Sequence, residues 1–229
     1  IIYYNKLVDD RYKTILYDLS LNTKKIFDSP IQTIHPDGIE YLSINYERLH
    51  TLNSDYGYSV KCKKYHNKGN GIWKCNFNSD IEPKLIVSTN DLKKINHDFQ
   101  GNYNNEFNHC LYSETGDYFV FIYRYMNKNH KFSKLILADL TTSVLSLKCI
   151  NDSFVSHMCW INQNNIFYFG DSDHGSKGYY KYNILTSKAI RIMPKNLTDG
   201  HPNINPDKKW IILDTYPDKE MQGDVEERE

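Results

Sequence analysis

One pattern recurs along this 229-residue chain: a histidine, a short alternating strand, a polar turn and a second, strongly apolar strand. Its clear copies begin at His109, His157 and His201, and a weaker copy begins at Ile34. The three histidines lie roughly 45 residues apart, and a repeat of that period marks an array of similar units, each one supersecondary element. The repeat therefore limits the chain to folds in which such units pack side by side.

Each complete hairpin is followed by two further strand candidates joined by a short polar turn. A similar outer pair lies near the N-terminus. These candidates are residues 134–140, 144–147, 178–184, 189–192, 13–19 and 24–27. Four strands joined as hairpins form one blade of a β-propeller. We predict an all-β protein, a β-propeller of four-stranded antiparallel blades with almost no helix, spanning residues 1–218 as a complete or an incomplete ring.

Composition supports strands and excludes several partners. The 19 Tyr, 10 Phe and 3 Trp favour pleated, half-buried surfaces. Lys plus Arg equals Asp plus Glu, at 28 each, so no net field draws the chain to nucleic acid or anionic lipid. No apolar run reaches the ~18 residues that span a bilayer. The 5 irregularly spaced cysteines argue for a reducing compartment. We expect no nucleic acid, no membrane and a cytoplasmic location, with periplasm and secretion left open.

A long insertion interrupts one unit at about residues 46–72. Insertions of this length in compact repeats are functional or disordered. Its Tyr, Arg and Gly content favours an ordered loop that projects from one face, with Tyr56 and Tyr58 partly covering the channel or an adjacent blade. The alternative is a packing loop over a blade edge. The polar tail, residues 219–229, is expected to be disordered.

The repeated histidines occupy equivalent positions, at the start of the innermost strand of each blade. In a propeller these positions surround the mouth of the central channel, where imidazoles can bind a metal or act as a base. The alternative is that each histidine caps its own blade by a hydrogen bond to the backbone.

Three short segments carry a resemblance to known families. The turn at residues 205–210, Asn-Pro-Asp-Lys-Lys-Trp, resembles the Ser-Pro-Asp-Gly-Lys turn of TolB-like, WD-type propeller repeats, and residues 35–38 resemble a shortened copy. Residues 196–202 are similar to the Gln-x-x-His-x-His-Pro segment of oligogalacturonate lyases, a propeller family whose Gln and His residues bind manganese.

The lyase resemblance implies a divalent-cation site and a base. The implied ligands are His157, His201, Asn196 and Asp199. Asn196 and Asp199 replace a Gln and a His of the family, which changes the ligand set and suits manganese or calcium. His109 falls where the family has its base. Arg124 would then offset the substrate carboxylate, unless it is a solvated strand residue.

We therefore expect a carbohydrate-active propeller that binds acidic oligosaccharide, with metal-assisted β-elimination as the implied lyase reaction. Tyr56, Tyr58 and Tyr216 are the candidate substrate-binding residues. The alternative is a noncatalytic scaffold for a protein partner, as TolB-like and WD-type repeats often are. A hydrolase on the same fold is the third hypothesis. Convergence of His109, His157 and His201 would favour an enzyme.

Overall fold

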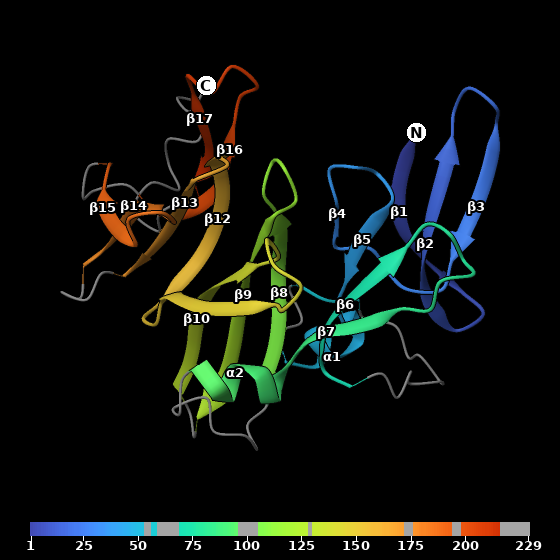
Figure 1. The fold of residues 1–229 in the computed structure, drawn as a ribbon, viewed down its shortest axis with the longest axis horizontal. Helices are drawn as coiled ribbons and strands as arrows, with labels where there is room; N and C mark the ends of the chain where they lie inside the picture. Colours follow the sequence, from blue (N-terminus) through green and yellow to red (C-terminus); the bar gives the residue numbers. More distant parts are fainter. Residues whose placement is uncertain are drawn as a thin grey trace, which may run out of the picture. The chain divides into compact units, whose positions relative to one another are not determined.

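The structure is a computed structural model, and it divides the chain into two compact units, Ile1–Cys149 and Ile150–Glu229 (Figure 1). We describe each unit by itself. The described residues are 1–52, 56–58, 69–95, 105–127, 130–171, 176–193 and 198–215. Asn196, Tyr216 and the predicted tail from residue 219 lie outside them.

The first unit contains three antiparallel sheets in chain order. The three-stranded sheet comprises β1 (Ile2–Val8), β2 (Arg11–Asp18) and β3 (Thr23–Phe27). The second sheet comprises β4 (Thr33–Ile34), β5 (Glu40–Ser43), β6 (Gly71–Asn76) and β7 (Lys84–Ser88). The third comprises β8 (Asn105–Tyr112), β9 (Tyr118–Asn127), β10 (His130–Asp139) and β11 (Ser146–Asn151). Each strand pairs with its neighbour in sequence, so every sheet is a meander.

The second unit continues the same pattern. One four-stranded sheet comprises β12 (Val155–Asn162), β13 (Asn165–Asp171), β14 (Lys177–Asn183) and β15 (Lys188–Arg191). A hairpin of β16 (Gly200–Ile204) and β17 (Ile211–Thr215) follows. The repeated hairpins of the sequence are β8–β9, β12–β13 and β16–β17. The predicted all-β fold of four-stranded antiparallel blades is confirmed.

Strand burial explains why the apolar runs are continuous in the middle of each sheet. Residues 119–122 of β9 have both faces covered and are 0% exposed. Aromatic side chains on one face of the third sheet, among them Phe107 and Phe121, pack with Leu42 and Ile72 of the second sheet. In the second unit, Ile211 and Leu213 of β17 pack on Phe167 and its neighbours. Apolar packing therefore joins successive sheets within each unit.

The described residues contain two seven-residue helices, which agrees with the prediction of almost no helix, although the sequence did not predict where they lie. The first, α1 (Tyr46–Leu52), opens the insertion at one end of the second sheet, and α2 (Thr89–Ile95) follows β7 (Figure 1). Helices this short depend on caps and tertiary packing, because their intrinsic stability is marginal. The Asn45 side chain accepts the Arg48 N–H at 2.9 Å, and Leu49 is 1% exposed. In the described ranges, no helix is long and apolar enough to cross a membrane.

Candidate functional site

The three repeated histidines lie on the first strand of their sheets: His109 on β8, His157 on β12 and His201 on β16. His109 belongs to the first unit, and the other two belong to the second. His109 lies in a bulge of β8, where the pairing with β9 shifts between Asn108 and Leu111. Its φ of 51° is in the left-handed region, which is uncommon outside glycine and turns the side chain away from the regular strand direction.

Tyr56, from the insertion, brings two predicted catalytic residues together. Its ring makes an edge-to-face contact with His109, with the ring centroids 5.4 Å apart. The Arg124 guanidinium lies 5.0 Å from the centre of the same ring, a cation–π contact. The structure therefore places His109, Arg124 and Tyr56 in one cluster of the first unit, although Tyr56 and Arg124 are far apart in sequence.

Glu106 adds a carboxyl group that sequence reasoning missed. It pairs with Arg124 across the β8–β9 ladder, and its Oε1 lies 3.8 Å from Arg124 Nη1. Both side chains are 5% exposed or less. Burial raises the pKa of Glu106 despite the opposing effect of Arg124, Lys131 and Arg48. The usable signal was an acidic and a basic residue in otherwise apolar strands, but their partnership depends on the strand register.

This cluster changes how Arg124 is best understood. Its guanidinium faces Glu106 and lies against Tyr56. The positive charge that the sequence prediction paired with a substrate carboxylate therefore already has partners within the protein. Buried charges in proteins are normally compensated in this way. The roles of His109 as a base and of Arg124 as a partner of substrate stay predictions.

Two histidine–aspartate pairs form a second cluster, in the second unit. His157 Nδ1 lies 3.0 Å from Asp199 Oδ1, and His201 Nδ1 lies 2.9 Å from Asp214 Oδ1. The two imidazole centroids are 4.0 Å apart. Hydrogen bonds from the backbone N–H and the side chain of His201, together with the positive charge of a protonated imidazole, lower the pKa of the Asp214 carboxyl. The structure thus brings three of the four predicted metal ligands together; the fourth, Asn196, lies outside the described residues.

The two pairs are not arranged as a metal centre. A shared ion would sit roughly 2.0–2.6 Å from each ligand atom, with the ligand atoms converging on it. Within the part of the chain that the structure describes, no group of three or more His, Cys, Asp or Glu residues is arranged to hold a metal ion. Each Nδ1 instead faces a carboxylate oxygen at hydrogen-bond distance. The divalent-cation site therefore stays a prediction.

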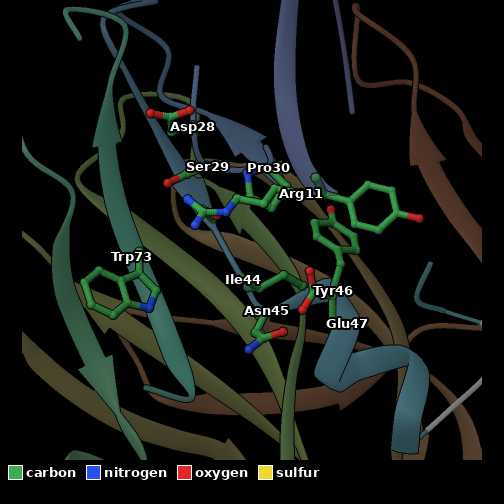
Figure 2. Close-up of a pocket in the computed structure, with 11 residues that line it drawn as sticks. Arg11, Asp28, Ser29, Pro30, Ile44, Asn45, Tyr46, Glu47 and Trp73 are labelled. Carbon is green, nitrogen blue, oxygen red and sulfur yellow. The ribbon is translucent and has the colours of Figure 1, made fainter. Parts of the chain in front are cut away.

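A cleft in the first unit brings together charged, aromatic and amide side chains that no sequence motif predicted (Figure 2). Its empty space is about 550 Å³, including the part open to solvent. β2, the end of β5, the start of α1 and β6 all contribute to its walls. The residues that give it chemical character are Arg11, Tyr12, Asn45, Tyr46, Glu47 and Trp73. With Asp28, which also lines it, the cleft offers a guanidinium, three aromatic rings, an amide and two carboxylates.

Figure 2 shows the Arg11 side chain extending across the cleft toward the side where Ser29 and Trp73 lie. Trp73 is half-buried, and its Nε1 donates to the Gly69 carbonyl at 3.3 Å, which orients the indole. Arg11 and Trp73 come from different sheets, so only the tertiary structure could have paired them. Of the predicted substrate-binding residues, Tyr58 contacts two walls of this cleft and Tyr56 lies in the cluster around Arg124.

Comparison with known proteins gives similarity at the level of solved structures alone, since no family model and no curated protein matches the chain. An acylaminoacyl peptidase in complex with Z-Gly-Gly-Phe-chloromethyl ketone matches with a TM-score of 0.48 and 10% identity, over 84% of this chain and 30% of that one. TolB from Acinetobacter baumannii matches with a TM-score of 0.40 and 11% identity, over 91% and 50% of the two chains.

An oligogalacturonate lyase in complex with manganese matches with a TM-score of 0.45 and 12% identity, over 92% of this chain and 70% of the lyase. This chain spans less than a third of the peptidase and half of TolB. The matched structures thus include both kinds of propeller, TolB and oligogalacturonate lyase, to which the sequence segments are similar.

Proposed function

We propose that the first unit binds an acidic oligosaccharide in the cleft lined by Arg11 and Trp73. The observation that carries the proposal is the presence of a guanidinium and three aromatic rings in one cleft. Ligand sites typically combine apolar walls with a few convergent polar groups. The similarity of residues 196–202 to oligogalacturonate lyases suggested an acidic sugar without reference to the cleft. The cleft supplies groups that suit such a sugar.

Each part of a uronide has a matching group. The flat C–H face of a sugar ring stacks on an aromatic side chain, and Trp73 presents a half-buried indole whose orientation is held by Gly69. A carboxylate is recognised by the fork of N–H donors on arginine, which pairs with both oxygens. The Asn45 amide can donate a hydrogen bond to a sugar hydroxyl or accept one from it, and the Glu47 carboxylate can accept one.

The charge balance of the cleft makes Arg11 the decisive residue. Asp28 and Glu47 are acidic lining residues, and Lys13 Nζ lies 2.9 Å from Asp28 Oδ1. The cleft has no general positive field, because its acidic and basic groups are balanced. Preference for an acidic sugar must therefore come from the guanidinium itself.

The test is isothermal titration calorimetry of the whole chain with short oligogalacturonides and with neutral galactose oligomers of equal length. Arg11→Ala should weaken oligogalacturonide binding at least ~10-fold, the equivalent of one lost charge-assisted hydrogen bond of ~1.4 kcal/mol or more. Trp73→Ala should weaken both classes of ligand. Trp210, which is 71% exposed in the second unit, provides the matched control, and Trp210→Ala should bind like the wild type. Absence of binding to either ligand class would favour the protein-interaction scaffold.

The catalytic part of the proposal is β-elimination with a divalent cation, manganese or calcium. It rests on the similarity of residues 196–202 to the manganese-binding segment of the lyases and on the place of His109 in the same unit as the cleft. His201→Ala should remove any thermal stabilisation by manganese, because a ligand of the folded state stabilises it by mass action. His109→Ala should keep that stabilisation and abolish formation of an unsaturated, ultraviolet-absorbing product. Binding without such a product would leave a carbohydrate-binding protein that is not a lyase.

A further inference from the structure

We propose that residues Tyr56, Gly57 and Tyr58 form a strap that holds the aromatic wall of the cleft in place, with Tyr58 as the positioning residue. The inference rests on the proposed function, because it concerns how the cleft receives a flat sugar ring. Tyr58 is not itself a lining residue of the cleft. Its effect on the ligand therefore passes through the side chains that it contacts.

Tyr58 contacts two of the three aromatic residues that line the cleft. Its ring stacks on Tyr46, with the centroids 4.7 Å apart and the planes at 20°. Its ring also contacts Tyr12, with the centroids 4.3 Å apart. Tyr12 lies on β2 of the first sheet and Tyr46 begins α1, so Tyr58 joins a wall of the cleft that comes from a sheet to one that comes from a helix.

Polar contacts fix this aromatic group at its edges. Asn5 Nδ2 donates to the Tyr58 hydroxyl at 3.0 Å and to the Ile31 carbonyl at 2.8 Å. The Tyr46 hydroxyl donates to the same Ile31 carbonyl at 2.9 Å. These connected hydrogen bonds are partly buried, and together they favour one arrangement of the side chains. The positions of the two wall tyrosines are therefore linked through Tyr58 and Asn5.

The other end of the strap is anchored on the third sheet. Tyr56 lies against Arg124 and His109, as described above. Between the two tyrosines, Gly57 approaches α1 so closely that a Cβ atom there would lie 2.1 Å from the His50 backbone nitrogen. Only glycine permits this approach. The strap thus touches the first sheet, α1 and the third sheet, and it has little freedom to shift.

The geometry of the cleft follows from this arrangement. Removing the Tyr58 ring would leave Tyr12 and Tyr46 without the surface that they both contact, and both rings would gain rotamer freedom. A ligand would then have to order them again, which lowers affinity. Tyr58→Phe keeps both ring contacts and loses only the hydroxyl that accepts from Asn5. The two substitutions therefore separate positioning from hydrogen bonding.

The experiment measures oligogalacturonide affinity and amide hydrogen exchange on the whole chain. Tyr58→Ala should weaken binding about 10-fold, which corresponds to ~1.4 kcal/mol, and Tyr58→Phe should remain within about twofold of the wild type. Tyr17, a partly exposed tyrosine of β2 bonded to Asn22, provides the matched control; Tyr17→Ala should leave affinity unchanged. Unchanged affinity in Tyr58→Ala, with Arg11→Ala still impaired, would overturn the strap but not the proposed function.

Hydrogen exchange tests the strap even in the case that the proposed sugar binding is wrong. The amides of residues 43–49 line the cleft or lie on α1, and the Leu49 N–H donates to the Asn45 carbonyl at 3.0 Å. Tyr58→Ala should speed exchange across this segment, whereas Tyr58→Phe should not. If the wild type binds no sugar, this measurement still decides the inference: equal exchange in both variants contradicts a positioning strap.

Discussion

Two glycines in equivalent turns provide a controlled test of how neighbouring sheets of the first unit interlock. Gly38 has a φ of +73° and Gly116 a φ of +81°, and the N–H of each donates to the carbonyl three residues earlier, in His35 and Ser113. A Cβ atom added at Gly38 meets nothing within 4 Å. At Gly116 it would lie 1.9 Å from Nε2 of His35, which belongs to the turn before β5.

The expected costs of alanine follow from these surroundings. At either position alanine must adopt a left-handed conformation, which costs ~1 kcal/mol or somewhat more. Gly116→Ala must also displace the His35 imidazole, which makes an edge-to-face contact with Tyr112 at 4.9 Å between centroids. Losing such a contact costs ~1 kcal/mol. Gly116→Ala should therefore lower the free energy of unfolding by ~2–3 kcal/mol, and Gly38→Ala by ~1 kcal/mol.

Urea unfolding, followed by tryptophan fluorescence, measures both values. His35→Ala serves as a second control, because it removes the obstructing ring before alanine is introduced at Gly116. In the double variant, Gly116→Ala should cost no more than Gly38→Ala does. Equal destabilisation by Gly116→Ala and Gly38→Ala in the wild-type background would refute the reasoning, since it would mean that His35 does not pack against Gly116.

Three further expectations concern buried and capping groups. Because burial raises the pKa of Glu106, the folded chain holds the proton of this carboxyl group more tightly than the unfolded chain. Glu106 should therefore make the free energy of unfolding fall as pH rises above ~4.3, by at most ~1.4 kcal/mol per pH unit. Glu106→Gln should remove that contribution, which urea titrations at several pH values would measure. The pKa of Asp214 is lowered instead, so the stabilisation by its carboxylate is fully present above about pH 3.9 and is lost as pH falls below that. Asp214→Asn should remove this acid-dependent loss of stability from thermal unfolding curves. Asn45→Ala should cost ~1 kcal/mol in the same thermal assay by removing the α1 cap, whereas Asn45→Ser should retain most of it.

Strand positions could be predicted from the sequence because they depend on local alternation and turn chemistry. The runs at residues 134–140 and 178–184 became β10 and β14, each differing at its ends by one to four residues. Their side chains alternate between faces with a period of two, whatever they pack against. The repeat also showed which hairpins are equivalent, and β8–β9, β12–β13 and β16–β17 follow it.

The helices and contacts between distant residues required the tertiary structure. α1 and α2 are too short to show a helical period, and Leu49 and Leu92 stabilise them only once the neighbouring strands exist to bury them. Glu106 faces Arg124 through a strand register that no local pattern specifies.

Sequence resemblance directed attention to the histidines, whereas the cleft that carries the proposed function lies where β2 and β6 bring Arg11 and Trp73 together. Local conformational preference acts over a few residues, so strands and turns could be predicted from the sequence. The cleft depends on how whole sheets pack within the first unit, and that packing is a property of the folded chain alone.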